Sequence, residues 1–392
     1  MTMRLAETRR PCAREQRSLR GSAAQRPRVL FLGSMYAGHG TRFLNLKAHA
    51  KNDPRVDCAY RSVTGWAEGG TIERLPLVPA ALKGRARAVA EAVAFAAFPR
   101  PDAIWTAAAT AVTPYLWSQT GRWRRPLVLD LDWTHEQQEA LAPLYYGRPP
   151  KRGLRRAAAG LLERALWRGV TLFTPWSRWA ADSLRRGGIH ERRIRVIPPG
   201  VDLRLWTPRP RLFSDENGPL RLLFVGGDFQ RKGGDILLEV FQTRLTGRCE
   251  LDIVTRDHVD APAGAWVHRA EANSSRLAEL YASADLFVMP SLAECFGIST
   301  LEAMASGLPV VVGDAGAARE IVDEGASGWL VQPTPEALAR TLEGALARRS
   351  ELQAMGLRGR AIVEARFDGR ANDRAVIDAV LEAIEVFKGG ER

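Results

Sequence analysis

The apolar residues of the chain fall into short continuous runs, most of them separated by segments with helical spacing. In the first half these runs occupy residues 28–33, 102–106, 126–132, 170–174 and 194–198. The second half starts again with runs at residues 220–227, 250–255, 285–290, 309–314 and 328–333. A continuous apolar run is typical of a parallel strand buried on both faces. Strands that alternate with helices therefore predict two α/β units, each built on a parallel sheet.

A segment rich in Pro, Gly and Asp, residues 198–219, separates the two series of strands and is the best linker candidate. At the end of the chain, residues 371–387 have apolar positions three and four apart, which predicts an amphipathic helix. The predicted organisation is a disordered basic arm (1–26), an N-terminal domain (27–205), a C-terminal domain (206–370) and a final helix (371–392). Two such domains would face each other across a cleft at the carboxyl ends of their strands, where sheets of this kind bind ligands.

Length and composition agree with this organisation. A chain of 392 residues suits two domains, and a hydrophobic fraction of 46% is ordinary for a protein with sizeable cores. No stretch of 18 apolar residues is present, so no membrane-spanning helix is expected. The arm is rich in Arg and lacks an apolar core, so it does not resemble a secretory signal. The alternative to a disordered arm is that the true start codon lies further downstream and residues 1–26 are not translated.

The four cysteines, Cys12, Cys58, Cys249 and Cys295, lie far apart without a CxxC pair. This spacing fits neither a disulfide framework nor a zinc site, and it suits the reducing cytoplasm. We therefore expect a cytoplasmic protein, either free or at the cytoplasmic face of the membrane.

The net charge of +12 is unevenly distributed. Residues 1–200 hold 34 Lys and Arg against 15 Asp and Glu, giving +19, whereas residues 201–392 hold 22 against 29, giving −7. A basic half suggests phosphate groups, a membrane surface or nucleic acid as partner, and an Arg-biased genome is the alternative explanation. Residues 148–170 place six cations on a predicted amphipathic helix, which would either lie on anionic lipid or simply cover the first domain. The six are Lys151, Arg152, Arg155, Arg156, Arg164 and Arg168.

The stretch ECFGISTLE, residues 294–302, has a glutamate at each end with seven residues between them. It follows a predicted strand, and we expect a helix from Ser299 to Ser306 with Gly307 as its stop. The amino end of that helix would bind an anion, while Glu294 and Glu302 would accept hydrogen bonds from sugar hydroxyls. Alternatively, Ser299 and Glu302 form a capping box, which is a purely structural role.

The longer stretch PSLAECFGISTLEAMASGLPVVVGDAGAAREIV, residues 290–322, resembles the donor-binding core of the retaining glycosyltransferases of family 4. These enzymes have the GT-B fold, two Rossmann-like domains facing a central cleft, and carry the motif E-x(7)-E. The resemblance implies that Glu302 holds the donor ribose and that Glu294 holds the donor sugar with the backbone of the loop. The implied donor-binding residues here are Glu294, Phe296, Gly297, Ile298, Ser299 and Glu302.

A second stretch, residues 222–241, resembles the first strand and loop of the same donor domain, in which a cation pair meets the diphosphate. Arg231 and Lys232 fit that pair. Two cations before a helix would neutralise a pyrophosphate and stabilise it as the leaving group. A solvated basic turn is the structural alternative. Neither a P-loop nor G-x-G-x-x-G fits this loop, so a nucleotidase or a dehydrogenase is disfavoured.

The first half matches the family less closely. Residues 36–46 fall where the family has a glycine-rich loop, so Gly38, His39 and Gly40 are expected near the donor phosphates or the acceptor, with Arg42 as a further anion contact. The family often has a histidine where this chain has Asp132. We therefore expect Asp132 to make the sugar or transition-state contact, with His135 as the alternative.

Asp132 also completes an Asp130-x-Asp132 pair, a metal-binding pattern of the other large glycosyltransferase fold. The cationic diphosphate site makes a metal unnecessary, so no metal and no cofactor are expected. The pair could equally place acidic charge before the next helix.

The sequence therefore predicts a retaining glycosyltransferase that moves a sugar from a UDP- or GDP-sugar to a glycan, lipid or small-molecule acceptor. The predicted catalytic residues are Asp132, Glu294, Arg231 and Lys232, and His268 and Arg269 are candidate contacts for the base. A catalytically silent nucleotide-sugar-binding protein and a nucleic-acid-binding protein that uses the basic half are the alternatives.

Overall fold

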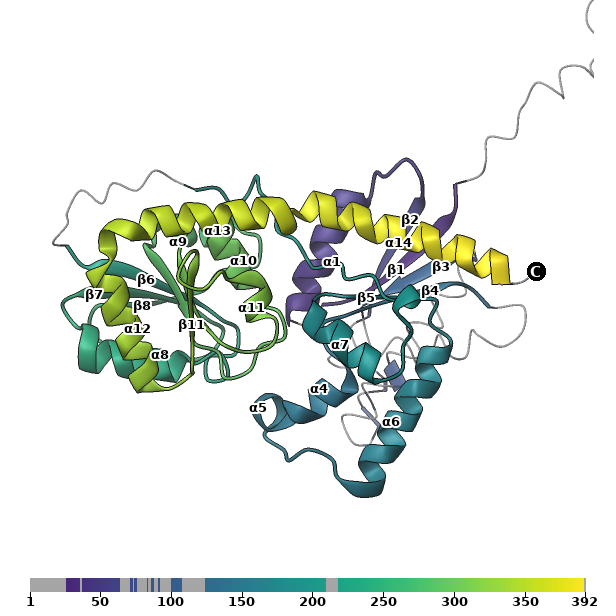
Figure 1. Ribbon diagram of the computed structural model, residues 1–392, viewed down its shortest axis with the longest axis horizontal. Coiled ribbons are helices and arrows are strands. Elements are labelled where there is room, and N and C mark those ends of the chain that lie inside the picture. The colour runs from purple at the N-terminus through teal and green to yellow at the C-terminus, as the bar shows by residue number, and fades with distance from the viewer. Residues whose placement is uncertain are drawn as a thin grey trace, which may run out of the picture.

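The computed structural model describes residues 26–35, 37–63, 100–107, 124–208 and 218–390, with a few isolated positions between 71 and 91. Within these ranges it contains two domains that lie side by side (Figure 1). The predicted basic arm, apart from Arg26, and residues 209–217 of the predicted linker lie outside the described residues.

The N-terminal domain is built on a parallel sheet with the strand order β2-β1-β3-β4-β5. Apolar clusters cover both faces of the sheet, which explains the continuous apolar runs in its central strands. Three helices, α4, α5 and α6, form a projection below this sheet in the view of Figure 1. The strands are β1 (Arg28–Ser34), β2 (Asp57–Val63), β3 (Ala103–Thr106), β4 (Leu127–Leu131) and β5 (Leu172–Pro175). The helices are α1 (Ala37–Ala50), α4 (His135–Ala140), α5 (Ala142–Tyr146), α6 (Gly153–Arg168) and α7 (Arg178–Arg186), with a short 3-10 turn at Glu191–Arg193.

The C-terminal domain has a second parallel sheet, with the order β11-β10-β9-β6-β7-β8, around one large apolar core. Its strands are β6 (Leu220–Val225), β7 (Cys249–Val254), β8 (Ala265–His268), β9 (Leu286–Met289), β10 (Val310–Gly313) and β11 (Gly328–Val331). Its helices are α8 (Gly234–Val240), continued by a π-helical turn at Phe241–Leu245, α9 (Ser275–Ser283), α10 (Ile298–Ala305), α11 (Ala318–Ile321), α12 (Pro335–Ala347) and α13 (Leu352–Arg366), with a 3-10 turn at Arg349–Glu351.

The strand order of each sheet reverses at one point. In the N-terminal sheet the reversal lies between β1 and β3, and in the C-terminal sheet it lies between β6 and β9. Loops that leave the carboxyl ends of strands at such a reversal form the usual ligand crevice of open α/β sheets. We therefore expect the segments after β1, β6 and β9 to form the ligand site.

Two details of the strand prediction were wrong. Residues 194–198 form no strand, only a bridge between Ile194 and Phe173, because Pro175 and Pro198 lack the N–H groups that a ladder needs. Strands β2 and β8 were missed. Both lie at the edge of their sheet, and the side chains of β2 alternate between exposed and partly buried, so neither strand gives a continuous apolar run.

The predicted final helix is α14 (Gly369–Gly390), and it crosses back to the N-terminal domain as expected, packing against α1 and strands β3 to β5 (Figure 1). The chain thus passes between the domains twice. The two crossings touch, because Val201 N donates to Phe367 O and Gly369 N donates to Val201 O, both at 3.0 Å. A Cβ on Gly200 would lie 2.5 Å from the Cα of Gly369, so this close approach needs glycine.

In the part of the chain that the structure describes, no helix combines the length and the apolar character that a membrane crossing requires.

Candidate functional site

The loops after β6 and β9 meet at the strand-order reversal of the C-terminal sheet. Leu292 N donates to the carbonyl of Arg231 at 3.0 Å, and the Arg231 guanidinium donates to the carbonyl of Ala293 at 2.9 Å. Gly233 has φ +77°, and a Cβ there would lie 2.1 Å from the carbonyl oxygen of Pro290. These contacts hold Arg231 and Lys232 directly beside the loop that carries Glu294.

Helix α10 begins at Ile298, one residue earlier than predicted, with Gly297 as its N-cap at φ +95°. The capping box that was the structural alternative does not form, because Ser299 lies inside the helix and its hydroxyl donates to the sulfur of Met289 at 3.4 Å. The capping role considered for Glu302 is therefore wrong. The amino end of α10 opens beside Lys232 and Glu294, and free helical amides there favour an anion.

Glu302 is almost completely buried, with 5% of its surface exposed. The hydroxyl of Tyr281 lies 3.1 Å from its Oε2 and 3.1 Å from the carbonyl oxygen of Ser299. Burial raises the pKa of Glu302 to about 8. The hydrogen bond that Tyr281 donates to the Glu302 carboxylate lowers the pKa of Glu302, but burial outweighs it.

Arg231 and Lys232 are largely buried, with 12% and 14% of their side chains exposed, so the solvated basic turn considered above is wrong. Arg231 pairs with Asp228 at 2.8 Å, and Lys232 pairs with Glu294. Burial, followed by the neighbouring Arg231 guanidinium, lowers the pKa of Lys232 to about 7. The cluster thus contains two cations and a carboxylate, and a ligand that binds them would replace the present ion pairs of Arg231 and Lys232.

The N-terminal domain brings His39 and Asp132 to the opposite wall of the cleft. His39 Nε2 lies 3.2 Å from Asp132 Oδ1, and the ring packs on Trp176 with centroids 4.8 Å apart. Burial opposes the charged form of His39, but the Asp132 carboxylate outweighs it, so the pKa of His39 is raised above its ordinary value. His39 Nδ1 is buried and has no hydrogen-bond partner among the described residues.

Gly38, His39 and Gly40 lie in the first turn of α1 and not in a loop, because the helix starts at Ala37, soon after β1. Gly38 faces the C-terminal domain, since a Cβ on it would lie 3.5 Å from the Cδ1 of Ile298. Gly38 therefore lies beside the start of α10, the predicted glycine-rich loop is wrong, and the expected contact of these residues with donor phosphates or acceptor stays a prediction.

Arg42 is completely buried and is not available for an anion, contrary to the expectation. It lies 3.6 Å from Asp130 and 3.1 Å from Asp373 on α14, so it ties the last helix to the N-terminal sheet. Asp130 also accepts hydrogen bonds from Thr174 and Trp176 at 2.9 and 2.5 Å. With Asp130 occupied in the core, only Asp132 of the Asp130-x-Asp132 pair faces His39. Within the described ranges, no three His, Cys, Asp or Glu side chains form a metal-binding group.

Three other candidates lie away from this cluster. His135 has its contacts on α4 and α6, with Gln138, Glu139 and Glu163. His268 pairs with Asp252 on β7 at 2.6 Å, and Arg269 donates to carbonyl groups of the loop after β7. The structure does not bring any of the three to Glu294 or Glu302.

Side chains that the sequence motifs did not identify close the cleft. Tyr145 on α5 lies under the Arg231 guanidinium, 4.2 Å from the ring centroid, and its hydroxyl is 3.3 Å from the Cys295 sulfur. Trp176 meets Phe296 edge to face with centroids 6.0 Å apart. Tyr145 and Trp176 give no signal in the sequence, because they belong to no motif and only the packing of the two domains brings them to Arg231 and Phe296.

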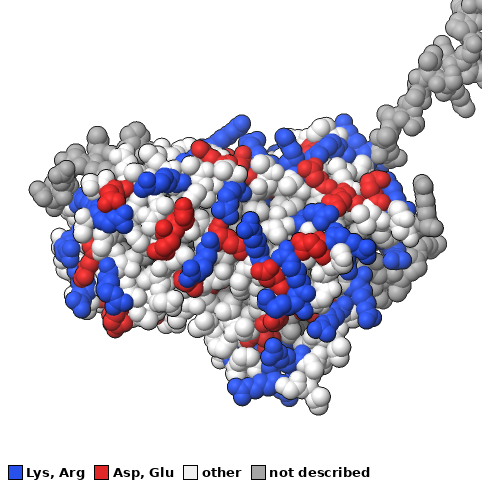
Figure 2. All heavy atoms as spheres, viewed as in Figure 1, with Lys and Arg blue, Asp and Glu red and all other residues white. Residues whose placement is uncertain are grey.

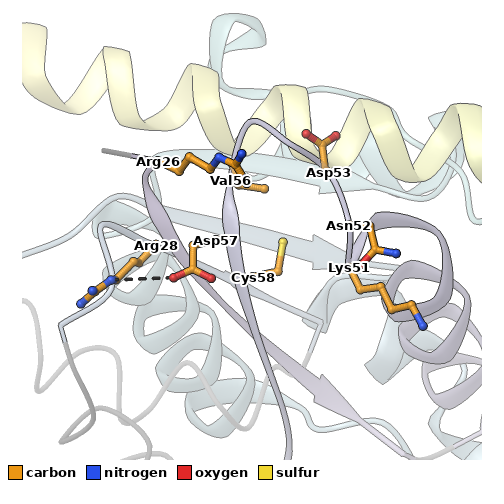
Figure 3. A pocket seen from close by; sticks show the side chains of 8 residues that line it. All are labelled: Arg26, Arg28, Lys51, Asn52, Asp53, Val56, Asp57 and Cys58. Atoms are coloured by element: carbon orange, nitrogen blue, oxygen red, sulfur yellow. Dashed lines mark ion pairs between the residues drawn. The ribbon is translucent and has the colours of Figure 1, made fainter. Parts of the chain in front are cut away.

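Two other hollows lie outside the cluster. One of about 530 Å³ lies at the amino ends of β1 and β2, where Arg28 pairs with Asp57 (Figure 3). The second, of about 480 Å³, lies beside the loops after β6 and β7 and is lined with carboxylates such as Asp235 and Asp257. The first hollow lies at the amino-end edge of the N-terminal sheet, opposite the edge at which the cleft lies. Neither hollow is lined by Glu294 or Glu302.

Two family models match the chain. Residues 12–200 match the glycosyl transferase 4-like domain, and residues 219–348 match the model described as glycosyl transferases group 1. Together they cover both domains of the structure.

Curated relatives give the same result. A D-inositol 3-phosphate glycosyltransferase of Xylanimonas cellulosilytica is 30% identical over 304 residues, which cover 68% of this chain and 69% of that protein. Another, of Geodermatophilus obscurus, is 36% identical over 195 residues, which cover 43% of each chain. With several such relatives the chain shares only about half of their length.

Two solved structures have the same fold over most of their length. Sucrose-phosphate synthase from Thermosynechococcus elongatus has a TM-score of 0.69 and 20% identity, covering 90% of this chain and 98% of that chain. The Anabaena protein HepE in complex with UDP-glucose has a TM-score of 0.67 and 19% identity, covering 91% of this chain and all of that chain.

Proposed function

Because the chain belongs to the family 4 glycosyltransferases and has the GT-B fold, we propose that it transfers a sugar from a nucleotide-sugar to an acceptor hydroxyl with retention of configuration. One observation carries the proposal: Arg231, Lys232, Glu294 and the amino end of α10 converge at a strand-order reversal, opposite His39. The names of the relatives support glycosyl transfer, and the UDP-glucose held by the Anabaena protein supports this class of donor.

The donor diphosphate binds to Arg231, Lys232 and the first amides of α10. Lys232 is paired with Glu294 in the ligand-free protein, and the diphosphate takes over the ammonium group. Glu294 is then free to accept hydrogen bonds from hydroxyls of the donor sugar, while Glu302 accepts from the ribose. Each charged group of the cluster thereby receives a partner of opposite polarity.

During transfer, the bond between the anomeric carbon and the diphosphate oxygen breaks, and the cations stabilise the departing charge. The acceptor oxygen bonds to the anomeric carbon on the face that the diphosphate leaves, so the configuration is retained. The proton of the acceptor hydroxyl passes to the departing phosphate oxygen. This route needs neither a metal nor a pair of carboxylates at glycosidase spacing.

His39 takes the place of the family histidine at the reacting sugar, and Asp132 positions its ring. Asp132 is the residue at the family position, but its Oδ1 lies 3.2 Å from His39 Nε2, so the carboxylate supports the imidazole in that place. Tyr145 and Trp176 cover the cluster from the N-terminal side and exclude water, which favours transfer over hydrolysis.

Calorimetric titration with UDP, GDP and ADP, and then with the matching nucleotide-sugars, tests the donor site. We expect one nucleotide to bind, and Arg231→Ala to weaken it at least tenfold, about 1.4 kcal/mol, while Arg244→Ala on the exposed surface of the same domain leaves binding unchanged. If no nucleotide binds to the folded wild type, the proposal is wrong.

Proton NMR of slow donor hydrolysis tests the stereochemistry. A retaining enzyme first releases the sugar anomer that the donor carries. Release of the opposite anomer would exclude retention, and binding without any turnover would indicate a silent nucleotide-sugar-binding protein.

A further inference from the structure

Helix α6 carries three large apolar side chains that face solvent. Leu154, Leu161 and Leu162 are 90%, 67% and 61% exposed. Their spacing of seven and eight residues places them on one side of the helix, two turns apart. Scattered single leucines are ordinary on a protein surface, whereas three on one helical face form a continuous apolar strip.

The opposite side of α6 packs on the domain. Trp167 is buried in the cluster beneath the N-terminal sheet, and Glu163 accepts a hydrogen bond from the backbone N–H of His135 at 2.8 Å. The orientation of the helix is therefore fixed by its inner face. The three leucines are turned outward and do not contribute to the core.

Positive charge flanks the leucines, because Arg155, Arg164 and Arg168 lie beside them at helical spacing, whereas Arg152 and Arg156 project on the opposite side at the amino end of the helix. The exposed cations are Arg152, Arg155, Arg156, Arg164 and Arg168, and none has an ion pair or hydrogen bond within the described part of the chain. The only acidic residue of the helix is Glu163, which is turned inward. Figure 2 shows Lys and Arg side chains on the lower projection of the molecule, where α6 lies.

We propose that the outer face of α6 docks on a lipid bilayer that contains anionic phospholipids. The leucines enter the boundary between headgroups and acyl chains, and the arginines bind lipid phosphates. Leucines and arginines together favour a lipid surface over nucleic acid. A nucleic acid would pair with the arginines but would leave the three exposed leucines without apolar contact. The charge is complementary to the bilayer over the whole exposed length of the helix.

Docking here would place the cleft close to the membrane surface. α5 belongs to the same projection, and its Tyr145 contacts Arg231 of the candidate donor site. The acceptor or product could then remain in the lipid phase. This consequence rests on the proposed function, whereas membrane binding by α6 does not.

Flotation with vesicles tests the proposal on the full-length protein. We expect binding to phosphatidylcholine vesicles that contain phosphatidylglycerol, no binding to pure phosphatidylcholine, and loss of binding as salt shortens the range of the charges. Leu154→Gln/Leu161→Gln/Leu162→Gln should weaken the partition roughly tenfold or more, since glutamine keeps the helix propensity but not the apolar contact. Arg155→Glu/Arg164→Glu/Arg168→Glu should do the same.

Matched controls lie on the other side of the molecule. Leu357→Gln on α13 and Arg244→Glu/Arg248→Glu/Arg340→Glu in the C-terminal domain change the same residue types at exposed positions, and both should bind vesicles like the wild type. Circular dichroism and nucleotide affinity verify that each variant is folded.

Three results would overturn the proposal. If only the arginine variant loses vesicle binding, the attraction is non-specific and α6 does not insert. If the leucine variant binds vesicles normally but changes the monomer–dimer equilibrium or the melting temperature, the strip is covered by a second copy or by another part of the chain. If RNA competes fully with the vesicles and binds the leucine variant equally well, the basic helix serves nucleic acid.

Discussion

The buried carboxyl of Glu302 predicts that nucleotide binding releases a proton. With a pKa of about 8, Glu302 is about nine-tenths protonated at pH 7. Ribose hydroxyls donate hydrogen bonds and therefore stabilise the ionised carboxylate, so binding lowers this pKa. If the bound pKa lies near the ordinary value of Glu, about 0.9 proton leaves Glu302 for each nucleotide bound at pH 7, and about 0.1 at pH 9.

Lys232 also changes the total number of protons released on binding, so the wild type must be compared with Glu302→Gln. Its pKa of about 7 should rise when a diphosphate binds, so Lys232 takes up a proton as Glu302 releases one. The uptake at Lys232 is common to the wild type and Glu302→Gln, and it cancels in their difference. The glutamine still offers an acceptor oxygen to the ribose, so binding stays measurable.

The assay is calorimetric titration of the nucleotide in buffers with different ionisation enthalpies, at pH 7 and pH 9. We expect the wild type and Glu302→Gln to differ by about 0.9 proton at pH 7 and by about 0.1 at pH 9. Because the wild type must release a proton to bind, its affinity for the nucleotide should rise with pH below pH 8, relative to that of Glu302→Gln. The difference in binding free energy should change by up to about 1.4 kcal/mol for each pH unit. An equal proton count for both proteins at pH 7 would show that the ribose does not contact an ionised Glu302.

Further predictions concern the other wall of the cleft and the crossing between the domains. His39→Asn should lower kcat at least tenfold. Asp132→Asn removes the carboxylate that raises the pKa of His39, so the imidazole stays neutral at lower pH. An enzyme that uses the neutral imidazole should then remain active at lower pH than the wild type. Gly200→Ala places a Cβ 2.5 Å from backbone and should lower thermal stability by about 1–3 kcal/mol, whereas Gly160→Ala, with open space around it, should not. Tyr145→Ala should raise donor hydrolysis relative to transfer, and Tyr145→Phe should not.

The proximity of the candidate donor residues was predictable because most of them are close in the sequence. Glu294 and Glu302 lie on one loop and the helix that follows it, so local geometry alone holds them at a fixed relation to the amino end of α10. Arg231 and Lys232 lie in the loop after the neighbouring strand, β6, and a parallel sheet necessarily brings this loop and the loop after β9 to one edge. The central strands were found for a similar reason, since strands buried on both faces consist of continuous apolar runs.

The acceptor side was not predictable to the same extent, because its residues meet only through packing. His39 belongs to α1 and Asp132 follows β4, and their spatial relation depends on how α1 lies on the sheet. Tyr145 and Trp176 reach the cluster only when the two domains face each other. The buried environment of Glu302, which raises its pKa, depends in turn on Tyr281 from another helix.

A few polar contacts join the two domains on either side of the aromatic contacts. The Glu320 carboxylate accepts hydrogen bonds from the backbone N–H groups of Arg178 and Trp179, both at 2.8 Å, at the amino end of α7. On the other side Asn273 donates to Asn45 at 2.9 Å. We expect these few contacts to separate by a rotation at the two crossings near Gly200, since neither sheet continues across the domain boundary. For the proposed donor to reach Lys232 and the amino end of α10, we expect Tyr145 to move away with α5, and the same movement to be needed for release of the product.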